Sequence, residues 1–191
     1  HAGAEPIFID VDRNTWCLDP NQLKSAISFG IKAFISVDLF GNSCNSKALR
    51  DIADKENIFF IEDAAEALGT KYKNKHIGIY SDAVTFSFFG NKTVTTGEGG
   101  MVSFRFKDFA AKAKLIRDHG MDPNKKYWHT ILGYNLRITN IQSALGVAQM
   151  ERLENIVKCK VDINKYYKKY LNPRFVCQTE EVDTKSSWWL N

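Results

Sequence analysis

The sequence has 191 residues, of which 44% are hydrophobic and 25% charged, a composition that fits a soluble globular protein of one or one and a half domains. The net charge of +4 is mild and lysines are interleaved with acids, so a nucleic-acid-binding protein is not favoured. No apolar run approaches the roughly 20 residues that span a bilayer, and no signal segment opens the chain, so we expect no membrane contact.

The four cysteines form no C-x-x-C pair and have no zinc-like spacing with the histidines. This pattern predicts no metal site and a reducing, cytoplasmic setting.

The first 63 residues alternate between apolar runs and amphipathic helices. Strands are predicted over 6–11, 32–41 and 58–63, where the sequence reads "PIFIDV", "KAFISVDLFG" and "IFFIED". Asp19-Pro20 predicts the start of a helix, with an N-cap followed by proline at the first helical position, and "SKALRDIADKEN" (46–57) predicts a second helix. Apolar strands separated by helices indicate a parallel sheet covered on both faces.

Shorter strand-like pieces and then helices follow. "AVTFSFF" (83–89) and "GGMVSF" (99–104) predict strands, and "KDFAAKAKLIRDHG" (107–120) predicts a helix that ends at a glycine. Thr139-Asn140 caps a long predicted helix that begins "IQSALGVAQMERLENIV". The last residues, 173–191, indicate the start of a new pair of strands.

Asp63 ends the run "IFFIED" and is therefore expected at the carboxyl end of a buried parallel strand. Ligands bind at that edge in open α/β sheets, and an acid there can anchor a cation. The alternative is a turn or helix cap, because Asp commonly ends strands. Position alone does not decide between the two.

Lys92 lies between an apolar run and a glycine-rich turn, in "SFFGNKTVTTGEGG" (87–100). A P-loop is not favoured, because the match to its consensus fails at two positions. A lysine amine can also form a Schiff base with a carbonyl, and a pyridine cofactor would further need an acid at its ring nitrogen and donors for its phosphate. Asp63 and Ser87 could supply these groups. The pattern is that of a pyridoxal phosphate enzyme, with a surface lysine in a hairpin as the alternative.

The motifs "EDAAEA" (62–67), "FSFFGNKTVTTGEGGMV" (86–102) and "GMDPNKKYW" (120–128) closely resemble the DegT/DnrJ/EryC1/StrS aminotransferases, a branch of fold type I pyridoxal phosphate enzymes. The resemblance covers nearly the whole chain. It implies an α/β fold of the aspartate-aminotransferase type. Residues 1–150 would form an incomplete large domain with a mainly parallel sheet, and 151–191 the connecting helix and the beginning of a small C-terminal domain.

The resemblance also implies roles for individual residues. Lys92 would form a Schiff base with pyridoxal 5'-phosphate and then move protons, Asp63 would pair with the pyridinium nitrogen, and Ser87 would bind the phosphate. Glu66 stands close to the cofactor where many relatives have Gln or His, a variant that fits the perosamine-type subgroup. Asn135 matches an asparagine that relatives lend to the phosphate of the neighbouring subunit, which implies a homodimer with shared sites.

The implied reaction passes an amino group from glutamate to the 4-keto group of a nucleotide-linked 6-deoxy sugar, with GDP-4-keto-6-deoxymannose as the expected substrate, for O-antigen or other surface polysaccharide. Lys92 argues against the sugar dehydratases of the family, which have histidine there. Family members have an N-terminal segment and a C-terminal segment that this sequence does not include, so we expect a truncated gene product or a piece of a longer polypeptide. The alternative function is a non-catalytic remnant that at most associates with an intact aminotransferase.

Other polar and aromatic residues remain open at this point. His119 and His129 have no partner at a motif spacing and are expected to be structural. Arg137 could bind a sugar phosphate or form a salt bridge. Tyr127-Trp128 could line a sugar pocket or pack.

Overall fold

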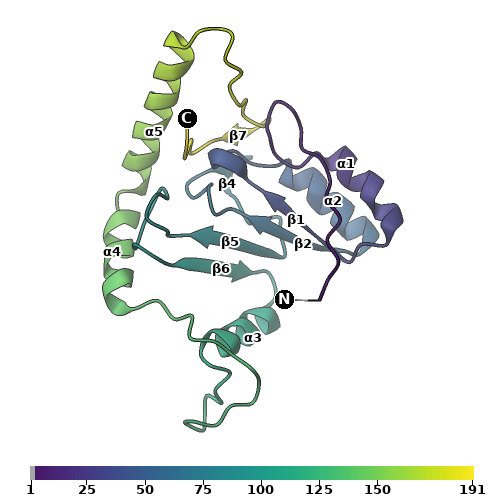
Figure 1. Ribbon diagram of the computed structural model, residues 1–191, viewed down its shortest axis with the longest axis vertical. Helices are drawn as coiled ribbons and strands as arrows, with labels where there is room; N and C mark the ends of the chain where they lie inside the picture. The colour runs from purple at the N-terminus through teal and green to yellow at the C-terminus, as the bar shows by residue number, and fades with distance from the viewer. Residues whose placement is uncertain (1–2) are drawn as a thin grey trace.

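The computed structural model describes residues 3–191 and has a four-stranded sheet at its centre (Figure 1). The strands are β1 (Ala33–Val37), β2 (Phe59–Asp63), β5 (Ala83–Ser87) and β6 (Gly100–Phe104), in the order β1-β2-β5-β6. The first three are parallel and β6 is antiparallel to β5. The predicted mainly parallel α/β sheet is therefore confirmed.

Two helices on one side of the sheet begin where the sequence predicts. Helix α1 (Pro20–Ala26) starts at Asp19, whose carboxylate accepts a hydrogen bond of 2.8 Å from the Asn21 amide. Helix α2 (Ser46–Glu56) is capped by Asn45 and ends at Asn57 in the left-handed conformation. Short 3-10 turns, η1 (Ile27–Phe29) and η2 (Leu39–Gly41), follow α1 and β1.

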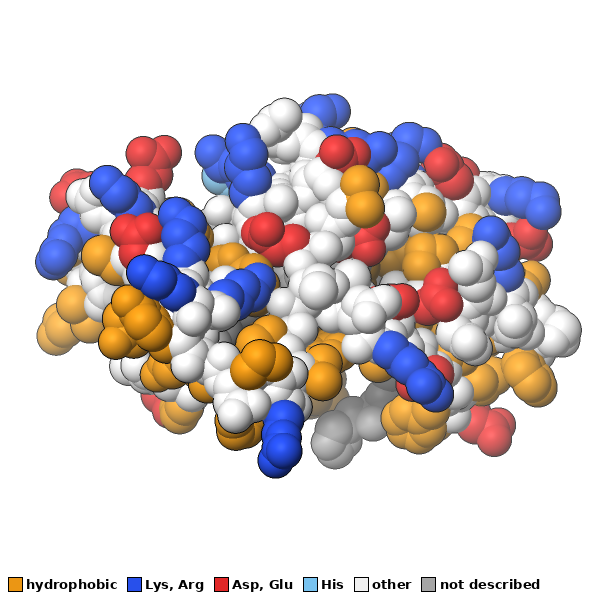
Figure 2. Space-filling model, turned by 90° about the horizontal axis from the view of Figure 1, so that it is seen from above, with side chains coloured by type: hydrophobic (Ala, Val, Ile, Leu, Met, Phe, Trp, Pro, Cys, Tyr) orange, Lys and Arg blue, Asp and Glu red, His pale blue; other side chains and the backbone are white. Residues whose placement is uncertain are grey.

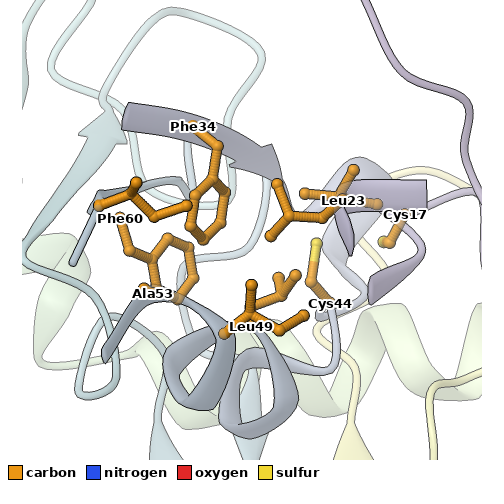
Figure 3. Packing of buried hydrophobic residues seen from close by; sticks show 10 residues of the cluster. Cys17, Leu23, Phe34, Cys44, Leu49, Ala53 and Phe60 are labelled. Carbon is orange, nitrogen blue, oxygen red and sulfur yellow. The ribbon is translucent and has the colours of Figure 1, made fainter. Parts of the chain in front are cut away.

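The main hydrophobic core lies between these helices and one face of β1 and β2 (Figure 3). Leu23 of α1 and Leu49 of α2 are fully buried there. They pack with Phe34 and Phe60, whose rings stack with centroids 4.7 Å apart. Full burial of one such side chain contributes about 1.5–3 kcal/mol, so this core fixes β1 and β2 on the helices.

The opposite face of the sheet is partly open, which corrects the expectation of helices on both faces. Ile35 and Val37 of β1 point to that side and are 61% and 41% exposed. Helix α3 (Lys107–Arg117) reaches it at β2, where Phe109 meets Phe59 edge-on at 5.4 Å. Both α1 and α2 pack on the Phe34 side, so within residues 3–191 β1 has helices on one face.

The strand predicted over 6–11 does not form. In this segment only Val11 makes a ladder contact, an isolated bridge to Leu18. Ile7, Phe8 and Val11 are exposed, whereas Ile9 packs against the hydrophobic core. Most of the apolar residues that suggested a buried strand therefore face solvent, and Pro6 has no amide hydrogen to donate.

The rest of the chain forms a small sheet and two helices. Strands β3 (Lys71–Tyr72), β4 (Lys75–His76) and β7 (Thr184–Lys185) are antiparallel, in the order β4-β3-β7. The sequence of residues 173–191 had suggested the start of a new pair of strands. Instead, the C-terminal strand β7 pairs with β3. Thr139 caps α4 (Asn140–Met150) in a capping box, as predicted, but the expected long helix divides before α5 (Leu153–Tyr170), where Arg152 has φ −106° and ψ 4°.

Acidic and basic side chains are intermixed over the face seen in Figure 2. In the part of the chain that the structure describes, no helix combines the length and apolarity needed to cross a membrane. The same residues contain no group of three or more His, Cys, Asp or Glu side chains placed to hold a metal ion.

Candidate functional site

The carboxyl ends of the parallel strands meet at one edge of the sheet. Val37, Asp63 and Thr85 are in register across β1, β2 and β5. Asp63 Oδ1 accepts hydrogen bonds of 3.1 Å from the Thr85 hydroxyl and of 3.1 Å from the Ala65 amide. These bonds orient the carboxylate at the edge where open α/β sheets bind ligands.

Lys92 lies in the loop that follows β5. Its amide donates to the carbonyl of Phe89 over 3.0 Å, which closes a turn. Helix α4 holds the loop, because the Gln149 side-chain amide accepts from Thr95 N–H (3.1 Å) and donates to Thr95 C=O (2.9 Å). Val94 is fully buried beneath it. The backbone that carries Lys92 is therefore fixed on both sides of the lysine.

The Lys92 ammonium and the Glu66 carboxylate form a part-buried ion pair. Lys92 Nζ lies 3.7 Å from Glu66 Oε1, with the two side chains 14% and 21% exposed. Glu66 Oε2 accepts a 2.9 Å hydrogen bond from the Phe40 amide. Phe40 has φ +57°, a conformation that costs an L-residue about 1–2 kcal/mol, and its bond to Glu66 helps to hold it.

Trp189, near the C-terminal end, covers the lysine. Lys92 Nζ lies 4.1 Å from the centroid of the indole ring, and the indole Nε1–H donates to the Asn91 carbonyl over 2.7 Å. The ring also stacks with Phe40 at a centroid distance of 6.4 Å. An aromatic face at this distance attracts the ammonium.

Two buried acids lie directly behind the edge. Asp38 Oδ1 accepts from the Cys44 amide at 2.9 Å, and Glu62 Oε1 accepts from the Ser46 hydroxyl at 2.9 Å. Burial, and then the neighbouring Glu62 charge, hold the pKa of Asp38 well above its usual range. Burial also raises the pKa of Glu62. Asp38 immediately precedes the η2 turn that carries Phe40, and its bond to the Cys44 amide ties together the chain on the two sides of this turn.

Of the predicted site residues, Lys92 and Glu66 are in contact, and Asp63 and Ser87 lie at the ends of adjacent strands. Ser87 Oγ accepts a 3.3 Å hydrogen bond from the Phe89 amide. Asn135 is elsewhere: it is exposed and forms an isolated bridge with Asp118, just past α3. No hydrogen bond or ion pair joins it to the other four among residues 3–191.

The residues left open by the sequence are peripheral here. Arg137 Nε pairs with Asp118 Oδ1 at 3.3 Å, and His129 Nδ1 lies 2.8 Å from the His119 carbonyl oxygen. Tyr127 and Trp128 are 84% and 55% exposed. The sequence did not single out Trp189, Phe40 or Thr85. Only Thr85 had a local signal, as it lies two residues before Ser87 on the predicted strand.

Comparison with known proteins identifies the family of the chain. The model of the DegT/DnrJ/EryC1/StrS aminotransferase family matches residues 1–191. The chain belongs to this family. GDP-perosamine synthase from Escherichia coli O157:H7 is 40% identical over 100% of the chain and 52% of its own length. GDP-perosamine synthase from Caulobacter vibrioides is 43% identical over 90% and 46%.

The fold comparison agrees with the family. A crystal structure of a DegT/DnrJ/EryC1/StrS aminotransferase from Brucella abortus has a TM-score of 0.89 and 29% identity, over 98% of this chain and 52% of that one. The fold is that of the pyridoxal-phosphate-dependent sugar aminotransferases of this family, as the resemblance implied. The chain spans about half the length of the curated relatives it matches.

Proposed function

We propose that the protein acts in the transamination of a nucleotide-linked 4-keto-6-deoxy sugar, with pyridoxal 5'-phosphate as cofactor. The similarity to GDP-perosamine synthases supports GDP-4-keto-6-deoxymannose as substrate and GDP-perosamine as product. We infer glutamate as the amino donor, the cytoplasm as the location and surface polysaccharide as the destination of the product.

One observation carries this proposal: a lysine amine is held at the carboxyl edge of the parallel sheet, where Asp63 lies at the end of a neighbouring strand. The Lys92 side chain is part-buried beside Glu66, so the amine is held near this edge of the sheet and does not extend freely into solvent. Among residues 3–191, the hydrogen bonds of the Asp63 carboxylate all fall on Oδ1. This leaves Oδ2 for a cationic N–H. The residues present fit a pyridine ring with a carbonyl group.

Pyridoxal phosphate, when bound, would supply a carbonyl that reacts with amines and a ring that withdraws electrons. Lys92 Nζ would bind that carbonyl. Afterwards it would take a proton from the carbon that bears the amino group of the donor and deliver it to the carbon that had been the carbonyl carbon of the cofactor. Asp63 would keep the ring nitrogen protonated through its negative charge. The Ser87 hydroxyl would donate to the phosphate, and Glu66 would receive the ammonium when Lys92 is free.

Asn135 supports a second part of the proposal, a homodimer with shared sites. Its side chain is exposed and is not joined to Lys92, which suits a residue that serves the neighbouring subunit. We also propose the division of the chain into 1–150 and 151–191, with the helix α5 as the connection.

The test is cofactor binding by the purified protein. Added pyridoxal phosphate is expected to produce an absorption band at the blue end of the visible range, and borohydride should then attach the cofactor to Lys92, as read from peptide masses. Lys92→Ala should lose both. Lys55→Ala, which removes a lysine with an 81% exposed side chain, should keep both. Asp63→Asn should weaken binding by about tenfold, because a hydrogen bond to a charged group is lost.

The same measurement distinguishes the proposed function from the alternative, a non-catalytic remnant. A band that persists in Lys92→Ala would contradict the role of Lys92 in holding the cofactor. The absence of any band in the wild type would contradict cofactor binding by this chain and leave association with an intact relative as its role.

A further inference from the structure

Trp189 contacts the lysine of the site although it comes from the far end of the chain. Lys92 Nζ lies 4.1 Å from the centroid of its ring, well inside the distance of about 6 Å at which an aromatic face attracts a cation. Trp189 is 5% exposed as a residue. Water therefore competes little with this attraction, which is stronger at desolvated sites.

The indole is held in place from several directions. Its Nε1–H donates to the Asn91 carbonyl at 2.7 Å, next to Lys92 in the loop. The backbone carbonyl of Trp189 accepts from Lys160 Nζ of α5 at 3.0 Å. The ring stacks with Phe40, whose amide binds Glu66. The same ring thus contacts Lys92 directly and is linked to Glu66 through Phe40.

The neighbouring Trp188 provides a comparison within the same segment. It is equally buried, at 5% exposure, but its ring lies 4.2 Å from Lys168 Nζ. Adjacent tryptophans thus hold different lysines, and loss of either ring should loosen the segment to a similar extent. Only loss of Trp189 should change Lys92.

We propose that Trp189 is a positioning residue: its ring and the Glu66 carboxylate together hold the Lys92 amine at the carboxyl edge of the sheet. A ring attracts the ammonium without accepting a directional hydrogen bond from it. The amine can therefore leave the ring for a carbonyl more easily than it could leave a second carboxylate. The catalytic meaning of this arrangement rests on the proposed function, but the contact itself can be tested without cofactor.

The test measures how fast each lysine reacts with trace acetic anhydride in the cofactor-free protein, by mass spectrometry. Acetylation of Lys92 is normalised to that of exposed Lys55. In Trp189→Leu we expect it to rise about three- to tenfold, as loss of a part-buried cation–π contact predicts. Trp189→Phe keeps an aromatic face and should lie between. Trp188→Leu should raise the acetylation of Lys168 and leave that of Lys92 unchanged.

Two results would overturn the proposal: unchanged Lys92 acetylation in a folded Trp189→Leu, or an equal rise in Trp188→Leu. If Trp189→Leu does not fold, the fluorescence of Lys92→Met decides. Removing the ammonium should shift the indole emission of the wild type but not that of a Trp189→Phe background. An absent shift, or the same shift in both backgrounds, would also overturn it.

These readouts need no pyridoxal phosphate. A chain that fails to bind the cofactor but shows the expected acetylation pattern would contradict the proposed function and still support the contact. The reverse pattern would support the proposed function and overturn the positioning role of Trp189.

Discussion

At the scale of single residues, the candidate site contains side chains that the sequence predicts and others that no local sequence pattern indicates. Lys92 and Asp63 could be placed near one edge from the sequence, because Asp63 ends one predicted strand, Lys92 follows another, and the ends of parallel strands meet at one edge. Phe40 and Trp189 could not. A left-handed Phe is rare enough that no sequence rule proposes it. The contact between Trp189 and Lys92 depends on how the C-terminal segment folds back.

Asp38 offers a prediction about pH. Burial raises the pKa of this carboxyl above its unfolded value, so the folded state binds more protons than the unfolded state between the two values. The free energy of unfolding therefore falls as pH rises through that interval. Asp38→Asn keeps an oxygen to accept from Cys44 and carries no charge. At pH 7 we expect it to raise the free energy of unfolding, because the variant side chain stays neutral in the folded and the unfolded state alike.

The check is chemical denaturation of both proteins from pH 4 to pH 8. The difference between Asp38→Asn and the wild type should grow with pH, because the carboxyl of the unfolded chain loses its proton above its ordinary pKa of 3.8, whereas the folded carboxyl keeps it. Asp51→Asn, at a position with a 61% exposed side chain, should stay within about 0.5 kcal/mol of the wild type throughout. A pH-independent difference for Asp38→Asn would contradict a buried proton at this position.

At the scale of elements, prediction succeeded where the signal is local. The starts of α1 and α4 follow from Asp19 and Thr139, whose side chains cap the first turn. It failed for residues 6–11 and for the pairing of the C-terminal strand. A strand forms only beside another strand. The apolar run at Ile7 and Phe8 gives no sign of whether a neighbouring strand lies beside these residues.

The α2 helix and the sheet are joined by a buried ion pair that sequence patterns also miss. Arg50 Nη1 lies 3.0 Å from Asp82 Oδ2, which also accepts from the Phe60 amide at 2.8 Å. Asp82→Ala would leave a buried guanidinium and a strand amide without this partner. We expect a loss of about 3–5 kcal/mol in the free energy of unfolding, measured with urea.

Asp54 gives a matched control, because it pairs with the same arginine at 2.8 Å but from a 61% exposed position. Asp54→Ala should cost less than about 1 kcal/mol. Equal losses for the two variants would show that the pair between α2 and the sheet is no stronger than a surface one.

At the scale of the whole molecule, the chain closes on itself at Gly41. The Gly41 carbonyl accepts hydrogen bonds from the Thr70 and Ser186 hydroxyls, each at 2.6 Å, and from the Ser187 amide at 3.1 Å. The C-terminal segment is thereby docked on the turn that follows β1, where it places Trp189 over the loop of Lys92. The integrity of the site thus depends on the C-terminal segment as well as on the turn that follows β1.

Gly41→Ala tests this closure. The glycine has φ +95°, and a Cβ there would lie 2.6 Å from the Trp189 amide nitrogen and 2.7 Å from that of Trp188. Gly30 provides the control: it has φ +71° and nothing within 4 Å of an added Cβ. Gly30→Ala should therefore show backbone strain alone, about 1–2 kcal/mol. Gly41→Ala adds a clash with backbone that cannot move without undocking the segment, so its loss of unfolding free energy should exceed that of Gly30→Ala by about 1–3 kcal/mol. Its tryptophan emission should also shift to the red as the segment is exposed, whereas Gly30→Ala should keep the native spectrum. Equal losses with an unshifted emission would mean that the C-terminal segment is not anchored at Gly41.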